Sequence, residues 1–333
     1  MTTFVPIEPF QPAWGATNPH AQTLLANFVR FTNGIQFQRE RLETPDGDFV
    51  DLDFADVDEY HKLWSEDTPI VLVLHGLEGN ARRGYMCELY QQLAAHGIRA
   101  VGLNFRSCSG EMNRTTLMYH SGATFDVEFV INWLSERFPN VPLGLAGFSL
   151  GANVTLKFMG ENGVAVNAAV SISPPFDLAA GSRVLEKGVS QIYTKRLLQK
   201  LRDKAKAKAP QLQQFIDVEA AINAQTFFQF DDAWAPLYGF RDAADYYQQC
   251  SSQNFLAAIR QPTLILRALD DPFFSPNDVP TGLIAHNPNI QAAFTKHGGH
   301  VAFIEGTHPK NYRYWAERQG ARFLAKMLKN ATT

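Results

Sequence analysis

The stretch that decides the fold is residues 141–161, VPLGLAGFSLGANVTLKFMGE. Its first half is a short apolar run and its second half continues without a break, which predicts a buried strand that turns directly into a helix. The turn holds GFSLG, a GxSxG pattern centred on Ser149. Small residues on either side of Ser149 suit such a turn, because side chains there would collide with neighbouring elements. We therefore predict that the Ser149 hydroxyl projects from the edge of a sheet.

Strand and helix signals alternate on both sides of this stretch. Apolar runs with strand character occupy PIVLVLHG, IRAVGLNF, VPLGLAGFS and VNAAVSIS, and helical segments near 84–96, 124–137 and 151–161 separate or follow them. Residues 36–55 add two alternating stretches around ThrProAspGlyAsp, which predicts a hairpin. Near-continuous apolar strands separated by amphipathic helices predict an α/β protein with a mostly parallel sheet covered on both faces.

The alternation stops after Pro174 and resumes at PTLILRAL and NIQAAFTK, before a closing helix, YWAERQGARFLAKML. We therefore expect an α/β core formed by residues 1–177 and 260–333, with an N-terminal arm. Residues 178–259 are expected to form an inserted helical cap. The core should carry its chemistry at the carboxyl ends of the strands.

The composition excludes several classes of protein. With 333 residues, 45% of them hydrophobic, the chain can bury a large core, so wholesale disorder is excluded. A net charge of −3 provides no field for nucleic acid, and the longest apolar run is too short to span a membrane. No leader segment is visible, and Cys87, Cys108 and Cys250 lack a CxxC pattern. We expect a cytoplasmic protein without a disulfide framework or a zinc knuckle.

A serine hydroxyl becomes a good nucleophile only when a base lies within hydrogen-bond reach and an anion orients that base. Both residue types follow Ser149 in the chain. Asp270 and Asp271 come directly after PTLILRAL, and His300 ends LysHisGlyGlyHis after the next strand. This order of Ser, Asp and His predicts a catalytic triad, with either adjacent carboxylate as the acid.

A tetrahedral intermediate also needs backbone donors for its developing negative charge. The N–H of Leu150 directly follows the nucleophile at the start of a helix. A second N–H is expected from Leu77, which follows His75 and Gly76 after the first buried strand. We therefore predict an oxyanion hole formed by Leu77 and Leu150.

Several motifs together suggest a family. They are AsnProHisAlaGlnThrLeu at 18–24, LeuHisGlyLeuGluGly at 74–79, AsnPheArgSerCysSerGly at 104–110, GlyPheSerLeuGlyAlaAsn at 147–153 and AspAspProPhe at 270–273. In this combination the chain resembles the α/β-hydrolase superfamily, and within it the YheT-like branch of esterases. The resemblance implies a serine hydrolase acting on carboxylic esters, with relatives that act on lipid esters or transfer acyl groups to alcohols.

Carried onto this chain, the resemblance assigns the nucleophile to Ser149, the base to His300 and the acid to Asp271, with Asp270 as its rival. One position departs from the superfamily pattern: Ser107 stands where a Gly usually follows the arginine of AsnPheArg. We expect that difference to alter a turn and not the chemistry.

The remaining polar motifs favour structural roles. His75 is expected to hold the oxyanion loop by hydrogen bonds. His297 and His300 lack a carboxylate cluster, so we expect no metal and no cofactor. The NPHAQTL segment predicts an arm that packs on the core, with Asn18 capping a helix whose first turn contains Pro19.

The basic stretch at 195–208, KRLLQKLRDKAKAK, is interpreted as a solvated face of the cap, with weak docking on an anionic membrane as the alternative. The predicted activity is that of a carboxylesterase, which acts on a small-molecule or lipid ester through an acyl-enzyme on Ser149. An acyltransferase and a non-catalytic binding module are the alternatives. No nucleic-acid partner is expected.

Overall fold

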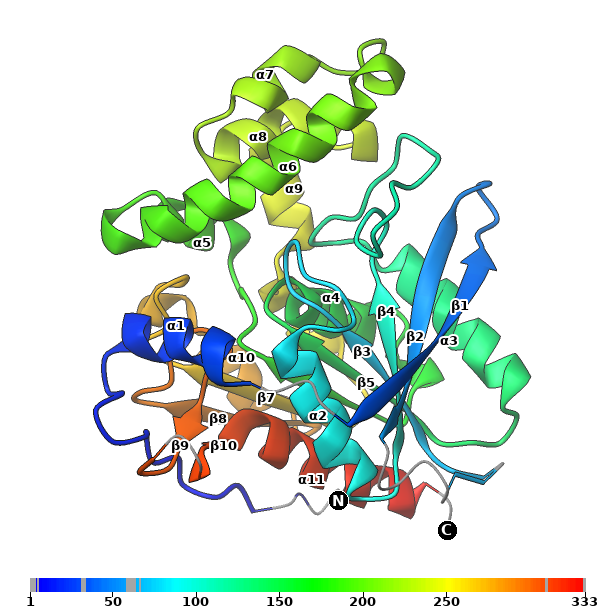
Figure 1. Ribbon diagram of the computed structural model, residues 1–333, viewed down its shortest axis with the longest axis vertical. Helices are drawn as coiled ribbons and strands as arrows, with labels where there is room; N and C mark the ends of the chain where they lie inside the picture. Colours follow the sequence, from blue (N-terminus) through cyan, green and yellow to red (C-terminus); the bar gives the residue numbers. More distant parts are fainter. Residues whose placement is uncertain are drawn as a thin grey trace.

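The computed structural model describes residues 4, 6–30, 34–57, 64–65, 67–308 and 311–331. Eight of the strands form one sheet in the order β1-β2-β4-β3-β5-β6-β7-β8 (Figure 1). They are β1 (Ile35–Glu43), β2 (Phe49–Val57), β3 (Ile70–Leu74), β4 (Arg99–Asn104), β5 (Leu143–Phe148), β6 (Ala168–Ile172), β7 (Thr263–Ala268) and β8 (Ile290–Thr295). Strand β2 is antiparallel to β1 and β4, and the remaining pairs are parallel. This sheet confirms the predicted α/β architecture.

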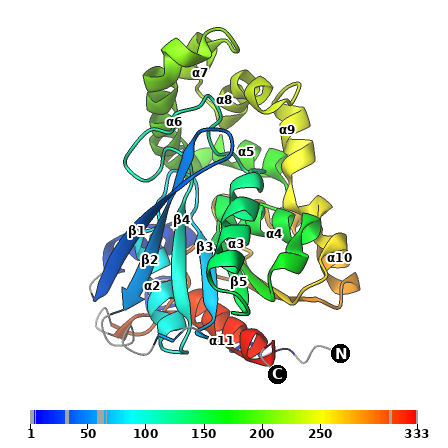
Figure 2. The same ribbon diagram turned by 90° about the vertical axis from the view of Figure 1, so that its right-hand side faces the viewer.

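Helices cover both faces of the sheet (Figure 2). The helices of the core are α1 (Pro19–Val29), α2 (Gly84–Ala94), α3 (Phe125–Arg137), α4 (Leu150–Glu161), α10 (Thr281–His286) and α11 (Trp315–Asn330). Strand β3 shows why two layers are needed, because its successive side chains point to opposite faces. Leu72 and Leu74 pack in the cluster that includes α3 and α4, whereas Val71 and Val73 pack in the cluster that includes α2 and α11.

Some short elements were not anticipated from the sequence. Helix α10 has six residues, and β9 (Ile304–Glu305) pairs with β10 (Arg313–Tyr314) in a second, two-stranded sheet. Segments this short carry too few residues to show a period of 2 or 3.6. The 3-10 turns are η2 (Gly163–Ala165), η3 (Gly188–Ser190), η4 (Ala235–Tyr238), η5 (Ser252–Asn254), η6 (Leu256–Ala258) and η7 (Pro276–Asp278).

The chain between β6 and β7 forms helices that lie above the carboxyl ends of the strands (Figure 1). They are α5 (Leu178–Leu185), α6 (Gln191–Leu212), α7 (Val218–Asn223), α8 (Phe227–Trp234) and α9 (Ala243–Cys250). Apolar side chains of α5 to α8 cluster around Leu198, Phe227 and Trp234, together with Met118 of the core, and those of α9 form a second cluster. We call residues 178–259 the cap, and its status as a separate domain stays a prediction.

Lysines of α6 fasten the cap to the core. Lys204 Nζ lies 2.7 Å from Glu78 Oε1, and Lys208 Nζ donates to the carbonyl oxygens of Asn113, at 2.9 Å, and Thr115. Lys208 is only 3% exposed. These two lysines therefore face the core, and the expected solvated face applies to exposed members of the basic stretch such as Lys195.

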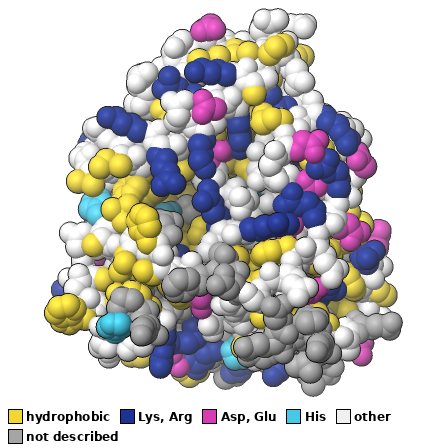
Figure 3. All heavy atoms as spheres, in the orientation of Figure 1, with side chains coloured by type: hydrophobic (Ala, Val, Ile, Leu, Met, Phe, Trp, Pro, Cys, Tyr) yellow, Lys and Arg dark blue, Asp and Glu magenta, His cyan; other side chains and the backbone are white. Residues whose placement is uncertain are grey.

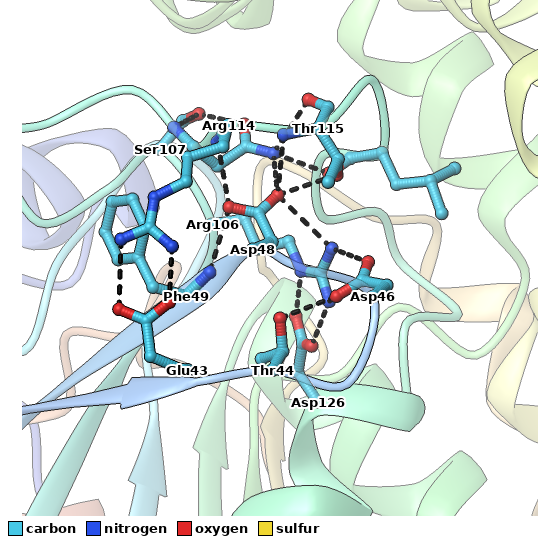
Figure 4. A network of polar contacts seen from close by, with 12 residues as sticks. Glu43, Thr44, Asp46, Asp48, Phe49, Arg106, Ser107, Arg114, Thr115 and Asp126 are labelled. Carbon is cyan, nitrogen blue, oxygen red and sulfur yellow. Dashed lines mark hydrogen bonds and ion pairs between the residues drawn. The ribbon is translucent and has the colours of Figure 1, made fainter.

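The loop whose carbonyl oxygens accept hydrogen bonds from Lys208 is held by a polar network around the β1–β2 turn (Figure 4). Asp48 accepts hydrogen bonds from Asn113 Nδ2, Arg114 N and Thr115 Oγ1 at 2.6 to 2.8 Å. Although burial raises the pKa of Asp48, the hydrogen bonds from Asn113 and Thr115 outweigh it and lower this pKa to about 2. The network fixes a loop whose continuation, Met118 to His120, lines the cavity of the site.

Candidate active site

Ser149 lies between β5 and α4 in a strained backbone conformation. Its φ is 54° and its ψ is −117°, a region that residues with a Cβ rarely adopt. The glycine two positions before Ser149 is required, because a Cβ on Gly147 would lie 2.2 Å from the Gly151 carbonyl oxygen. The chain thus makes the sharp strand-to-helix turn that the GxSxG pattern predicts.

The structure brings Ser149, His300 and Asp271 together. His300 Nε2 lies 2.9 Å from Ser149 Oγ, and His300 Nδ1 lies 2.8 Å from Asp271 Oδ2. An ionised carboxylate can only accept hydrogen bonds, so Nδ1 carries the hydrogen and Nε2 is free to accept the serine proton. The three residues follow β5, β7 and β8, whose carboxyl ends lie at the same edge of the sheet.

Asp270, the rival carboxylate, lies elsewhere. Its Oδ1 accepts a hydrogen bond from the Gly299 N–H at 3.0 Å, and its Oδ2 lies 3.2 Å from His297 Nδ1. Asp270 therefore shapes the loop that precedes His300, and Asp271 is the carboxylate beside the imidazole.

Helix α1 also holds the His300 loop. Asn18 caps this helix by accepting from Ala21 N at 3.0 Å, as its sequence predicts. Thr23 Oγ1 accepts the His300 N–H at 2.9 Å, and Gln22 Oε1 accepts the Ile304 N–H at 3.0 Å. Gln22 is fully buried. The sequence predicts that this arm packs on the core, but its contact with the candidate base joins segments far apart in the chain and is not predicted.

Gly299 shows how closely α1 approaches that loop. Its φ is 62°, and an added Cβ would lie 2.6 Å from the Pro19 carbonyl oxygen and 2.7 Å from Thr23 Oγ1. A residue with a side chain would therefore push the loop away from the helix. The glycine pair before His300 was the signal in the sequence for this close packing.

Phe273 packs on the imidazole and was also missed. Its ring stacks on that of His300 with centroids 3.9 Å apart and an interplanar angle of 13°. On the other side, Phe273 contacts Tyr193 of the cap with centroids 4.9 Å apart. The imidazole is therefore fixed by packing as well as by its two hydrogen bonds.

The two predicted oxyanion donors line the same cavity as Ser149 and His300. Across the described residues, no protein group accepts a hydrogen bond from the backbone N–H of Leu77 or Leu150. The N–H groups on either side of Leu77 do have partners: Gly76 donates to Tyr85 Oη at 3.1 Å, and Glu78 donates to Tyr119 Oη at 2.8 Å. The loop is thus fixed while the Leu77 N–H is left for a ligand.

His75 fixes the loop after β3 through both ring nitrogens. Its Nδ1 lies 2.7 Å from the Gly76 carbonyl oxygen, and its Nε2 accepts the Phe105 N–H at 3.2 Å. Burial lowers the pKa of His75 to about 3, so the ring stays neutral. This geometry fits the structural role expected for His75.

A cavity of about 470 Å³ lies between the core and the cap, and Ser149 and His300 open into it. Its cap side is largely apolar, with Leu185, Leu197, Leu201, Phe227, Phe230 and Trp234 among its lining residues. Arg83, Arg196 and Lys200 also line it. On the face seen in Figure 3, Lys and Arg side chains gather across the middle, beside a hydrophobic patch.

Neither a metal site nor a membrane span is found among the described residues. In these ranges no group of three or more His, Cys, Asp or Glu side chains is arranged to hold a metal ion. Likewise, none of the described helices combines the length and the apolar character needed to cross a membrane.

Similar proteins match most of the chain. A family model described as the alpha/beta hydrolase fold matches residues 69–307. A protein of Escherichia coli named "Putative esterase YheT" is 36% identical, and the alignment covers 96% of this chain and 94% of that protein. The phospholipase ABHD3 of Bos taurus is 28% identical, with 97% of this chain and 80% of the relative covered. A monoacylglycerol lipase of Saccharomyces cerevisiae is also 28% identical, with 92% and 78% covered.

Among solved structures, an esterase of Pyrococcus furiosus has a TM-score of 0.58 over 97% of this chain and 99% of its own, at 17% identity. That similarity concerns the fold alone. The family match and the identity to the Escherichia coli protein together show that the chain belongs to the α/β-hydrolase fold family, in its YheT-like branch.

Proposed function

We propose that this protein hydrolyses carboxylic esters through an acyl-enzyme on Ser149. The observation that carries the proposal is the continuous hydrogen-bonded chain from Ser149 Oγ through the His300 ring to Asp271 Oδ2, with contacts of 2.9 and 2.8 Å. It lies at a strained turn that opens into a cavity large enough for a substrate.

In the first half of the reaction, Ser149 Oγ attacks the ester carbonyl carbon while His300 Nε2 takes the hydroxyl proton. Asp271 holds the ring in the tautomer that leaves Nε2 free, and it stabilises the imidazolium. The carbonyl oxygen becomes an oxyanion that the N–H groups of Leu77 and Leu150 stabilise. The alcohol then leaves with the proton from Nε2.

In the second half, His300 Nε2 takes a proton from water, and the resulting nucleophile attacks the acyl-enzyme carbonyl. The same oxyanion donors serve this second intermediate. Collapse releases the carboxylic acid and returns the proton to Ser149 Oγ, so the enzyme is regenerated. None of these steps calls for a cofactor.

The relatives support the ester class, since their names describe an esterase, a phospholipase and a monoacylglycerol lipase. The largely apolar cap side of the cavity supports an acyl chain as part of the substrate. We therefore propose a small-molecule or lipid ester as the substrate.

A fluorophosphonate probe tests the nucleophile directly. We expect one covalent adduct on Ser149, located by peptide mass spectrometry, and no adduct on Ser149→Ala. We also expect Ser149→Ala and His300→Ala to lower kcat for 4-nitrophenyl butyrate by at least about 10³-fold with an unchanged circular dichroism spectrum. Folded wild-type protein that forms no adduct would contradict the proposal and would favour a non-catalytic binding module.

A further inference from the structure

Asp231 on α8 is a carboxyl group that lines the substrate cavity without a cationic partner. Tyr247 Oη of α9 donates a hydrogen bond to Asp231 Oδ2 at 2.6 Å. Among the described residues no Lys, Arg or His forms an ion pair with this carboxyl group. Burial raises the pKa of Asp231 to about 7, and the hydrogen bond from Tyr247 only partly offsets that effect.

Aromatic rings wall the cavity around Asp231. Phe230 and Trp234, from the same helix, stack with centroids 5.1 Å apart, and Tyr246 and Tyr247 of α9 lie 5.3 Å apart. Tyr238 completes this group, and all five rings line the cavity. The five rings and Asp231 therefore line the same cavity.

The polar ends of these rings are already used by the protein. Trp234 Nε1 donates to Tyr238 Oη at 2.8 Å, and Tyr246 Oη accepts the Ser121 N–H at 2.8 Å. Tyr238 and Tyr246 thus already accept hydrogen bonds from the protein, and Tyr247 donates its own to Asp231. Asp231 is therefore the acidic group of this wall with which a ligand can pair.

Two of the positive charges that also line the cavity are bound by a loop of the core. Arg83 and Lys200 both donate to the Glu78 carbonyl oxygen, at 3.3 and 3.2 Å, in the loop after β3. His120 lies beside Tyr238, with centroids 4.3 Å apart, and burial lowers its pKa to about 3, so it is neutral. The cavity thus holds Arg83 and Lys200 near the β3 loop and, in the cap, an acid that forms no ion pair with any described residue.

A buried carboxylate costs free energy unless a positive charge accompanies it. The described residues supply none at Asp231, which is partly buried, so a ligand that brings one would reduce that cost. Aromatic faces attract ammonium groups in addition, and quaternary ammonium ligands are bound in aromatic cages for this reason. We propose that Asp231 and the rings of Phe230, Trp234, Tyr238, Tyr246 and Tyr247 form a subsite for an ammonium group of the ester substrate.

This inference rests on the proposed function, since it takes the cavity beside Ser149 to be the substrate site. It adds a substrate class: esters that carry a positively charged nitrogen on either the alcohol or the acyl part. The same subsite would recognise the charged nitrogen in either part of the ester. Esters that carry it on the alcohol part or on the acyl part show which of the two is bound.

Two pairs of isosteric esters provide the test. Choline butyrate and 3,3-dimethylbutyl butyrate differ only in a charged nitrogen or neutral carbon on the alcohol side. The 4-nitrophenyl esters of 4-(trimethylammonio)butanoate and 5,5-dimethylhexanoate make the same comparison on the acyl side. For at least one pair we expect kcat/KM to favour the cationic ester by about tenfold or more.

Asp231→Asn is expected to abolish that preference while leaving kcat/KM for the neutral esters within about twofold, which also shows that the variant is folded. Asp231→Glu should restore part of the preference. The matched control is Asp203→Asn on the exposed side of α6, where the carboxylate pairs with Gln199, and it should change nothing. Equal preference in wild type and Asp231→Asn, or none for either pair, would overturn the subsite.

The pH dependence gives a readout that needs no variant. A cation favours the ionised carboxyl group, so the preference should rise with pH around the Asp231 pKa of about 7 and be lost at lower pH. Burial raises the pKa of Tyr238, Tyr246 and Tyr247, so they stay neutral over this range, as does His120. The ratio of kcat/KM values within a pair cancels any pH effect that both esters share, and a flat ratio from pH 6 to 8 would contradict the proposal.

Calorimetry separates failure of the subsite from failure of the proposed function. The cationic esters are titrated at pH 8 into Ser149→Ala and into the same protein carrying Asp231→Asn. We expect binding to Ser149→Ala that weakens by about tenfold in the double variant, whether or not wild type turns over any ester. Equal affinity for both proteins would overturn the subsite and leave the hydrolase proposal standing.

Discussion

At the scale of single residues, the candidate site depends on neighbours that fix each reacting group. Ser149 adopts a φ of 54° because β5 runs directly into α4, and the strain is supported by close packing around Gly147. His300 is held by Asp271 on one side and by the Phe273 ring on its face. The two adjacent carboxylates, Asp270 and Asp271, point to different partners and should therefore differ in function.

Replacing each carboxylate separately tests this difference. We expect Asp271→Asn to lower kcat for 4-nitrophenyl butyrate by about 10³- to 10⁴-fold with little change in KM, because the amide no longer fixes the productive tautomer of His300. Asp270→Asn, which removes a loop contact only, should stay within about tenfold of wild type. Steady-state kinetics on both variants decides the matter, and a larger loss for Asp270→Asn would reverse the assignment.

At the scale of elements, helix α1 is attached to the site although it lies far from it in the sequence. Its Thr23 and Gln22 accept backbone hydrogen bonds from His300 and Ile304 at 2.9 and 3.0 Å. Arg30, which follows the helix, donates to the Val301 carbonyl oxygen at 2.7 Å and pairs with the buried Glu317. The helix therefore positions the loop that carries the candidate base.

Thr23→Val measures that positioning role. The variant keeps the shape of the side chain but removes the acceptor of the His300 N–H, so we expect kcat to fall by about tenfold while KM changes little. Thr23→Ser keeps the hydroxyl and serves as the control. The rate of fluorophosphonate labelling should fall in parallel with kcat, and equal rates for the valine and serine variants would show that the contact has no role in positioning.

At the scale of the whole molecule, the cap and the core meet along a line of basic residues. Lys204 and Lys208 form polar contacts with the core, whereas Lys195 and Arg196 are exposed. On the same molecule Phe28 of α1 is 81% exposed and lines the cavity, as Arg196 does. Exposed apolar and basic side chains at one opening suit contact with an anionic lipid surface.

Vesicle co-sedimentation tests this contact. At low salt we expect wild type to pellet with vesicles of phosphatidylcholine and phosphatidylglycerol, and Arg196→Glu to pellet several-fold less, because it reverses a charge at the opening. Arg260→Glu, an exposed charge reversal just before β7, is the matched control and should behave as wild type. Equal pelleting of all three proteins would leave the basic stretch as a solvated face of the cap.

The order of the strands and helices in the core, the turn at Ser149 and the chain order of Ser, Asp and His could be predicted from the sequence, because each depends on local periodicity or on a short motif. The choice between Asp270 and Asp271 could not, since adjacent residues have the same local pattern and differ only in where a loop points them. The contacts of Thr23 and Phe273 with His300 were missed for a related reason, as each joins segments distant in the chain.

The sequence by itself determined the fold class and the residue types available for the chemistry, because hydrophobic periodicity and the glycine-bounded turn are properties of contiguous residues. Only the tertiary structure decided which of these residues meet. The chain between Ser149 and His300 folds back through β6, the cap, β7 and β8, and no local pattern encodes where such a path ends. For the same reason, only the folded structure, in which α8 of the cap lines the cavity, shows that the carboxyl group of Asp231 faces the same cavity as Ser149.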